Sequence, residues 1–286
     1  MNSTALATRP GRWAAGGPAG IQPLCRAEPG APVWVDLGTA AGTTTAARFY
    51  CSLFGWRVVA RHRPLEDPVG YWVFQHGDKD VGGLAPAKHA TWTVYLAVTD
   101  VDAMARAVVD NGGEVLFGPM TLMDSGRMAV CADPQGATFT VWQADPDTEA
   151  EANAEANADA MGDTTPTTRY QLACRDVEAA KRFYGSVFGW EARTTSVRGG
   201  TTYTEFFCPG FERSVAGMVE VSDHRNDDTS ATWMVHFAVT DTDRVATLAA
   251  ELGGAVSVAP FDMPNVGRIA VIDDPEGAAF SVLQAA

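Results

Sequence analysis

Three polar side chains occur inside apolar segments, where they are candidates for acid–base chemistry. Asp36 lies between Val35 and Leu37, and His236 and Glu205 interrupt runs of apolar or aromatic residues. Desolvation favours the uncharged form of such groups, which allows them to exchange a proton near neutral pH. Each also has a simpler interpretation: His236 as a hydrogen-bonded core histidine, Asp36 as a local cap or ion pair, and Glu205 as a strand-edge acid that points to water.

Strand alternation predicts what each candidate faces, because successive side chains of a strand point to opposite faces. In segment 94–98 the valine and leucine side chains would pack on helices, and Tyr95 would face a cleft. We expect four catalytic groups: His236, Glu205, Asp36 and Tyr95. Applied to the first, fifth and last strands of each half, the same alternation predicts these substrate-binding residues: Trp34, Phe139, Gln143, Gln171, Met234, Phe280 and Gln284.

These strands belong to a unit in which one strand and one helix precede three further strands. The helix predicted over residues 46–54 carries Ala46, Phe49 and Leu53 at helical spacing and stops at Gly55. A second unit begins with the strand 92–99, and Asp100 is the expected N-cap of its helix. The order βαβββ therefore occurs twice in the first half of the chain.

The second half of the chain repeats the first. The segment 49–56, Phe-Tyr-Cys-Ser-Leu-Phe-Gly-Trp, reappears at 183–190, and the segment Asp-Pro-Gln-Gly-Ala-Thr-Phe at 133–139 reappears at 274–280. One insertion in the polar loop 222–228 keeps the remaining blocks aligned, which indicates a duplication. We predict a disordered tail over 1–30, a first domain over 31–144, a flexible acidic linker over 145–166 and a second domain over 167–286.

The composition excludes several classes of function. The net charge is −14, from 21 basic and 35 acidic residues, and no basic face is visible for a nucleic acid or an anionic membrane. No apolar run is long enough to span a membrane. The five cysteines are scattered, and the N-terminal residues lack the apolar core of a secretory signal, so we expect a cytoplasmic protein.

The combination of these motifs resembles the vicinal oxygen chelate superfamily, the group of glyoxalases, bleomycin-resistance proteins and extradiol dioxygenases. The resemblance rests on the repeated Phe-Tyr-x-x-x-Phe-Gly-Trp and Asp-Pro-x-Gly-x-x-Phe motifs, with Val-Thr-Asp-Val-Asp at 98–102 between them. It implies an α+β fold made of four βαβββ modules. Each pair of modules would form a curved mixed sheet around a cleft, with the helices outside.

The resemblance also raises the question of a metal. Metal-dependent relatives place His or Gln on the first strand, His on the fifth and Glu on the eighth. The matching positions here are Asp36, Tyr95 and Gln143 in one copy and Gln171, His236 and Gln284 in the other. Neither set holds two histidines and a carboxylate, so no metal cofactor is favoured. If a divalent metal did bind, its ligands would be Gln171, His236, Gln284 or Asp36.

Three functions remain open at this stage. The favoured one is a metal-independent acid–base enzyme that acts on a small aromatic or hydrophobic organic molecule, as in secondary metabolism. The alternatives are a protein that sequesters a drug or ligand, like bleomycin-resistance proteins, and a metal-dependent enzyme of the glyoxalase or extradiol dioxygenase type. The two copies differ at the cleft positions, which favours one working cleft, in the second copy. The expected partner is a small molecule, bound by a monomer or a homodimer.

Overall fold

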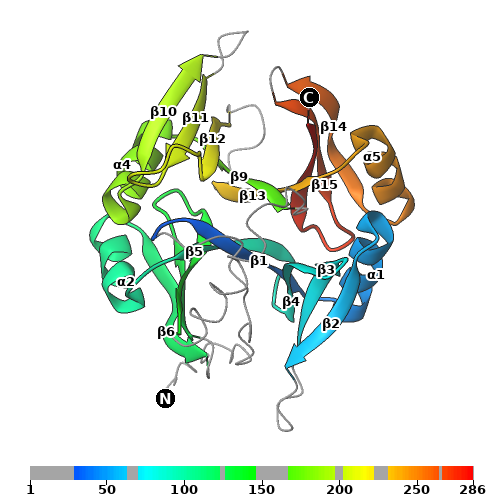
Figure 1. The fold of residues 1–286 in the computed structure, drawn as a ribbon, viewed down its shortest axis with the longest axis horizontal. Helices are drawn as coiled ribbons and strands as arrows, with labels where there is room; N and C mark the ends of the chain where they lie inside the picture. The colour runs from blue at the N-terminus through cyan, green and yellow to red at the C-terminus, as the bar shows by residue number, and fades with distance from the viewer. Residues whose placement is uncertain are drawn as a thin grey trace, which may run out of the picture.

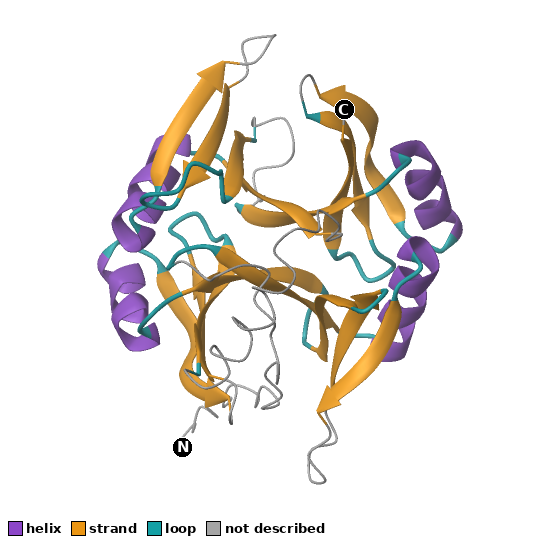
Figure 2. Ribbon diagram, in the orientation of Figure 1, coloured by secondary structure: helices purple, strands orange, loops and turns teal. Residues whose placement is uncertain are grey.

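The computed structural model describes residues 29–62, 70–122, 126–145, 167–196, 202–221, 231–263 and 266–285. These residues form two eight-stranded sheets with four helices (Figures 1 and 2). Each sheet comes from one half of the chain, which confirms the duplication. No helix in this described part of the chain is long and apolar enough to cross a membrane.

The first copy contains two βαβββ modules whose strands join in the order β2-β3-β4-β1-β5-β8-β7-β6. Strands β1 and β5 are antiparallel neighbours at the centre, and each module's last strand is parallel to its first. The elements are β1 (Pro32–Thr39), α1 (Thr43–Phe54), β2 (Arg57–His62), β3 (Tyr71–His76), β4 (Lys79–Pro86), β5 (Thr91–Ala97), α2 (Val101–Asp110), β6 (Glu114–Leu122), β7 (Gly126–Ala132) and β8 (Thr138–Ala144).

The second copy repeats this topology with the strand order β10-β11-β12-β9-β13-β16-β15-β14. Its central pair is β9 with β13, and the chain direction of every module is the same as in the first copy. The elements are β9 (Thr167–Cys174), α4 (Val177–Phe188), β10 (Glu191–Ser196), β11 (Thr202–Phe207), β12 (Ala216–Glu220), β13 (Thr232–Ala238), α5 (Thr242–Glu251), β14 (Ala255–Met263), β15 (Gly267–Asp273) and β16 (Ala279–Ala285).

The helix ends lie where the sequence places them. Gly55 ends α1 in the left-handed conformation, with φ of 70°, which a residue without a Cβ adopts at little cost. The side chain of Asp100 accepts a hydrogen bond from the backbone of Ala103 and so caps α2. Asp176 and Asp241 cap α4 and α5 in the same way.

The two sheets pack back to back, and their concave faces open in opposite directions (Figure 1). Strands β5 and β13 contact each other across the middle, and the helices lie along the two flanks as the pairs α1 with α5 and α2 with α4. The buried side chains between the sheets form one hydrophobic cluster to which both copies contribute. The copies therefore share a core, which the sequence did not predict.

The repeated motifs build this shared core. In the first copy the indole of Trp92 donates to Tyr50, whose hydroxyl donates to Asp274 of the second copy at 3.1 Å. The second copy forms the matching pair of hydrogen bonds. Its Trp233 indole donates to Tyr184 at 3.0 Å, and the Tyr184 hydroxyl donates to Asp133 of the first copy at 3.1 Å. Each Asp-Pro-x-Gly turn thus accepts a hydrogen bond from the helix of the other copy.

The residues after each aspartate add polar contacts across the same interface. Glu276 accepts hydrogen bonds from the backbone N–H groups of Ala40 and Ala41 at 2.7 Å each. Gln135 accepts from the backbone N–H groups of Arg175 and Asp176, at 3.0 and 2.8 Å, at the start of α4. Because these contacts satisfy backbone donors that precede a helix, they fix how one copy sits on the other.

The domain boundaries 31–144 and 167–286 stay predictions, although they bracket the strands of the two sheets. Most of the expected tail over 1–30 and of the expected linker over 145–166 lies outside the described residues.

Candidate functional site

The concave face of the first sheet carries a compact set of buried side chains on the side away from the helices. It comes from both modules, because β1 and β5 meet at the centre of the sheet. Alternation along these strands sends Val35, Val94 and Leu96 into the shared core and turns Trp34 and Tyr95 to the concave face. The buried residues of this face are Val33, Trp34, Tyr71, Val73, Tyr95, Ala97, Leu122, Met128 and Trp142.

Asp36 is the polar centre of this face. Its Oδ1 accepts hydrogen bonds from the indole Nε1 of Trp34 and the hydroxyl of Tyr71, both at 2.7 Å. Its Oδ2 accepts from the hydroxyl of Tyr95 at 2.6 Å. The structure therefore brings together Trp34, Asp36 and Tyr95, three of the residues that the sequence assigned to a cleft.

The electrostatics of this group follow from burial. Desolvation raises the pKa of Asp36 above its ordinary value, against the hydrogen bonds from Tyr95, Tyr71 and Trp34, which lower it. Burial also raises the pKa of both tyrosines well above the usual range, and the nearby Asp36 carboxylate adds to this. The tyrosines consequently keep their protons, and Asp36 is the member of the group that titrates most easily.

Sequence reasoning missed Tyr71, although the chain carries a signal for it. Gly83 lies next to Asp36 in the parallel pairing of β1 with β4. A Cβ at Gly83 would overlap both the Asp36 carboxylate and the Tyr71 hydroxyl, so only glycine leaves room for the hydrogen bond between them. A glycine inside a strand indicates such a close approach, and the Gly-Gly pair at 82–83 was the available clue.

The concave face of the second sheet is built on the same plan from different residues. Gln171 takes the place of Asp36 opposite Gly217, and Tyr203 again lies over that glycine. His236 replaces Tyr95 and pairs in register with Arg169 on β9. Glu205 pairs with Gly217 and Arg193, and it is only partly buried.

His236 faces away from the shared core, because Val235 and Phe237 on either side of it are core residues. Its side chain is 5% exposed. Burial, together with the positive charge of Arg169, lowers the pKa of His236 to about 4. The imidazole is therefore neutral at pH 7. Met234, two residues earlier on β13, shares its face and is partly buried.

Phe139 and Phe280 do not lie on the concave faces, so their expected position is wrong. Both are fully buried in the shared core. Phe139 packs against helix α4 of the second copy, with its ring 5.8 Å from that of Phe188, and Phe280 packs against α1 of the first copy, 5.5 Å from Tyr50. The alternation on β8 and β16 is shifted by one residue from the expected one. The side chains that point to the concave faces are instead those of Thr140, Trp142, Ser281 and Leu283.

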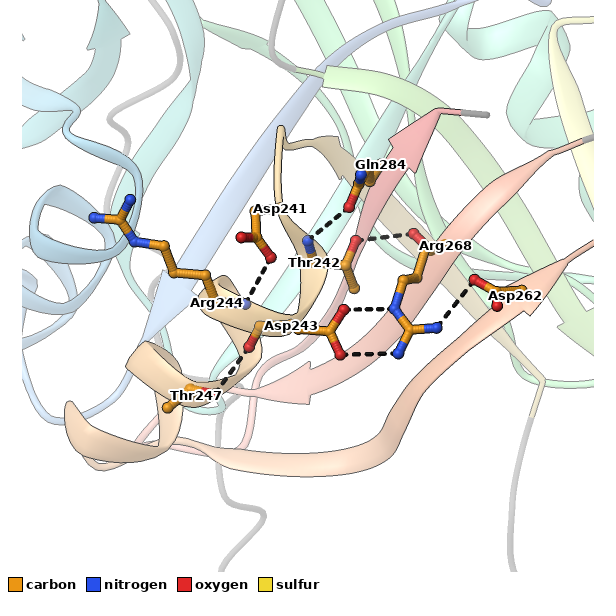
Figure 3. Close-up of polar contacts among 8 residues, drawn as sticks. All are labelled: Asp241, Thr242, Asp243, Arg244, Thr247, Asp262, Arg268 and Gln284. Atoms are coloured by element: carbon orange, nitrogen blue, oxygen red, sulfur yellow. Dashed lines mark hydrogen bonds and ion pairs between the residues drawn. The ribbon is translucent and has the colours of Figure 1, made fainter.

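Gln143 and Gln284 likewise point away from the concave faces. The side-chain oxygen of Gln284 accepts a hydrogen bond from the backbone N–H of Thr242 at the start of α5 (Figure 3). Gln143 does the same for Val101 at the start of α2, at 3.1 Å. Both glutamines satisfy a backbone donor at a helix N-terminus, and neither lies where a cleft ligand would need it.

Two repeated arginines form ion pairs within their own copies. Arg268 makes a bidentate contact with Asp243, at 2.5 and 2.8 Å, and reaches Asp262 at 3.0 Å (Figure 3). Arg127 pairs with Asp102 in the first copy. The pairs with Asp243 and Asp102 tie the first turn of each second-module helix to the sheet, and their side chains are between 31% and 58% exposed.

The four expected catalytic residues divide between two separate faces. Asp36 and Tyr95 share the concave face of the first sheet, and Glu205 and His236 lie on the second. These faces open in opposite directions (Figure 1). A joint site that uses Asp36 from one copy and His236 from the other is therefore excluded.

The donor set of neither face fits a divalent metal. No group of three or more histidine, cysteine, aspartate or glutamate side chains within the described ranges could hold an ion. Around Asp36 the neighbouring groups are an indole N–H, which cannot ligate, and two tyrosine hydroxyls that donate to the carboxylate. Beside His236 the register partner is Arg169, a cation.

Family models match both halves of the chain. Residues 167–282 match the glyoxalase/bleomycin resistance protein/dioxygenase superfamily, and residues 33–142 match a glyoxalase-like domain. The chain therefore belongs to the glyoxalase/bleomycin resistance/dioxygenase superfamily, as a member with two such domains in tandem.

Relatives of similar length support this assignment. The chain is 34% identical over 269 residues to the putative glyoxylase CFP32 of Mycobacterium tuberculosis, covering 90% of this chain and 95% of the relative. It is also 34% identical over 283 residues to the anthracycline biosynthesis protein DnrV of Streptomyces peucetius, covering 91% and 95%.

Solved structures share the fold at low sequence identity. The 2,3-dioxygenase LapB from Pseudomonas sp. KL28 superposes with a TM-score of 0.58 at 14% identity, covering 91% of this chain and 94% of its own. A Mn(II)-bound glyoxalase from Novosphingobium aromaticivorans gives 0.57 at 15%, covering 90% and 82%. At this identity the likeness concerns the fold alone.

Proposed function

We propose that the protein binds a small aromatic molecule on the concave face of its first copy and exchanges a proton with it through Tyr95 and Asp36, without a metal ion. The observation that carries this proposal is the 2.6 Å hydrogen bond between the Tyr95 hydroxyl and Asp36, on a face otherwise made of aromatic and aliphatic side chains. Sequence reasoning favoured the second copy, but among the described residues of the two concave faces only those of the first copy include a tyrosine hydrogen-bonded to a carboxyl group.

The aromatic side chains of this face support an aromatic ligand. Trp34, Tyr71, Tyr95 and Trp142 lie together on this face, each at most 6% exposed, and the rings of Tyr95 and Trp142 lie 6.5 Å apart in an edge-on arrangement. Aromatic rings prefer such offset or edge-on packing with one another, which a planar ligand can join. The relatives DnrV and DauV are named for anthracycline biosynthesis, and we extend to this chain a ligand of that kind, with fused aromatic rings.

The raised pKa of Asp36 supports proton exchange. A carboxyl group whose pKa lies closer to neutrality is a better acid–base catalyst, because both of its protonation states are accessible. Tyr95 would contact the ligand, and Asp36 would take up or return the proton through the tyrosine hydroxyl. The step moves protons only, so it needs no oxidant, reductant or further reactant.

A test uses 2-naphthol, a bicyclic phenol whose ring hydrogen at C1 exchanges with deuterium in D₂O through the keto tautomer. We expect the protein to accelerate this exchange, measured by proton NMR, and Tyr95→Phe or Asp36→Asn to lower the rate about 10²–10⁴-fold. His236→Phe, the matched change in the second copy, should leave the rate unchanged. Equal rates in all three variants would contradict the assignment of Tyr95 and Asp36.

A second candidate, a ligand-sequestering protein, is favoured by one observation. Both oxygens of Asp36 already accept hydrogen bonds from buried donors, and a network satisfied in this way can hold a ligand without reacting with it. Tight binding of 2-naphthol with no acceleration of deuterium exchange would favour this function over the enzyme.

A further inference from the structure

We propose that Trp34 and Tyr71 orient Asp36 so that Tyr95 presents its oxygen lone pairs, rather than its hydrogen, to the ligand. The first copy would then select aromatic molecules that carry a hydroxyl hydrogen-bond donor. This inference rests on the proposed function, because it names the class of molecule bound at the same face. It also makes Tyr71, which no sequence motif singled out, a positioning residue.

The argument begins at Oδ1 of Asp36. Two donors aim at this oxygen, the indole N–H of Trp34 and the hydroxyl of Tyr71, each at 2.7 Å. An indole N–H can only donate, and it also lies 3.0 Å from the Tyr71 oxygen, which directs the tyrosine hydrogen toward the carboxylate. Oδ1 is therefore held as an acceptor, and any proton that Asp36 takes up must reside on Oδ2.

The second step concerns Tyr95, which donates its only hydrogen to Oδ2. While Asp36 is ionised, the Tyr95 oxygen has only lone pairs left for a ligand. A ligand hydroxyl can then donate to it, whereas an ether or ketone cannot. When Asp36 takes up a proton on Oδ2, that proton donates to the Tyr95 oxygen, and the tyrosine hydrogen turns to the ligand. The preference for a donor is then lost.

The groups around the carboxyl come from five strands. Trp34 lies on β1, Tyr71 on β3 and Tyr95 on β5. The backbone of Gly83 on β4 lowers the pKa of Asp36. The side chain of Thr140 on β8 lies next to the Tyr95 hydroxyl and lowers its pKa, against the larger effect of burial. These neighbours are uncharged while the tyrosines are protonated. The hydrogen-bonding direction of Tyr95 is therefore controlled by the protonation of Asp36.

The second copy lacks this arrangement and provides the control. Tyr203 still lies over Gly217, but Gln171 stands where Asp36 does and His236 where Tyr95 does. The amide of Gln171 does not titrate, and the imidazole of His236 stays neutral until the pH falls to about 4, so above that pH neither group changes charge and reverses a neighbouring hydroxyl. Tyr203→Phe should therefore have no effect on ligand choice.

The experiment compares 2-naphthol with 2-methoxynaphthalene, which differ in the hydroxyl hydrogen, by calorimetric titration from about pH 4 to about pH 8, below the phenol pKa of about 10. At about pH 8 the full-length wild type should bind 2-naphthol about 10-fold or more tightly than 2-methoxynaphthalene. A difference of this size is the effect of one hydrogen bond to a charged network. The preference should fade as the pH falls through the titration of Asp36.

Two variants make the prediction specific. Asp36→Asn keeps the two acceptor contacts at Oδ1 and places an amide donor against Tyr95, so it should show the low-pH behaviour at every pH while still binding 2-methoxynaphthalene. Tyr71→Phe removes a hydrogen bond that lowers the pKa of Asp36, so the midpoint of the preference should move to higher pH. A merely structural role for Tyr71 would change both affinities equally.

The outcomes separate this inference from the proposed function. Binding of both probes with equal affinity at every pH would overturn the inference and leave the aromatic site intact. Binding of neither probe to the wild type would overturn both. If Asp36→Asn fails to fold, as judged by near-ultraviolet circular dichroism, the pH dependence of the wild type and of Tyr71→Phe decides the matter.

Discussion

In the first copy the concave face is centred on a carboxyl group, Asp36, whose neighbours are uncharged hydrogen-bond donors. In the second copy the corresponding face holds a neutral imidazole, His236, next to the cation Arg169, and the partly buried Glu205 lies three strands away on β11. The backbone plan is the same in both, down to a glycine under a tyrosine hydroxyl. The two concave faces therefore have the same backbone arrangement but carry different polar side chains.

On the convex faces, by contrast, the two copies carry the same polar residues. There the two copies use the same residues in the same hydrogen-bonded chains, Trp92 to Tyr50 and Trp233 to Tyr184, each ending on an aspartate of the other copy. The interface is nearly symmetric and the concave faces are not. The comparison suggests that packing between the copies constrains the convex side, whereas the concave sides are free to differ in ligand chemistry.

The largest effect should come from acidification of the second face. The pKa of His236 falls from its usual 6.5 to about 4 in the folded protein, so the unfolded chain takes up a proton first. The free energy of unfolding is therefore not affected by the titration of His236 above about pH 6.5. It falls by about 3 kcal/mol as the pH falls from there toward 4. Urea unfolding should show this loss for the wild type and a smaller one for His236→Phe. Identical losses would contradict the shifted pKa.

The matched glycines test how tightly each face is held. An added Cβ at Gly83 would overlap Asp36 and the Tyr71 hydroxyl, whereas one at Gly217 would overlap only the tip of Tyr203. Tyr71 is 2% exposed and hydrogen-bonded, whereas Tyr203 is only partly buried and can swing aside. Gly83→Ala should therefore cost about 1–3 kcal/mol, measured by urea unfolding, and Gly217→Ala should cost less. The reverse order would show that the first network is not rigid.

The interface tyrosines should give equal effects, in contrast to the concave faces. Tyr50→Phe and Tyr184→Phe each remove one hydroxyl that donates to a buried aspartate and accepts from a tryptophan. Each should lower the free energy of unfolding by about 1–2 kcal/mol. Thermal unfolding of both variants, with Tyr203→Phe as the control, would measure this, and a clear difference between Tyr50→Phe and Tyr184→Phe would contradict the symmetry.

The smallest effects should come from the exposed ion pairs. Asp102→Asn and Asp243→Asn each remove a carboxylate whose pKa the neighbouring arginine lowers, so any stabilisation is present at neutral pH and lost in acid. Arg268 keeps a second partner in Asp262, so Asp243→Asn should change the melting temperature less than Asp102→Asn. Both changes should shrink in high salt. A salt-independent loss would indicate a role other than ion pairing.

Much of the fold could be predicted from local patterns. Gly55 and Asp100 end and begin helices as expected, because these signals act through a few neighbouring residues. Alternation predicted that Tyr95 and His236 point away from the core, as they do. The residues on either side of each are aliphatic or aromatic, and they had to face the core.

Alternation failed on the last strand of each copy for an identifiable reason. In segments 138–144 and 279–285 apolar residues stand on both faces, so the pattern does not show which face meets the helices. Which face meets the helices depends on the other copy, because Phe139 packs against α4 of the second copy and Phe280 packs against α1 of the first. A contact made by residues far apart in the chain leaves no local periodicity to find.

The sequence by itself determined the duplication, the βαβββ order and the family, because the repeated motifs encode local turns, caps and helix faces. Only the tertiary structure decided that these motifs join the copies back to back, which separates Asp36 and Tyr95 from Glu205 and His236. It also decided that Trp34, Tyr71 and Tyr95 meet on one carboxyl group. Hydrogen bonds between β1, β3 and β5 depend on strand pairing and register, which are set by the packing of the whole sheet.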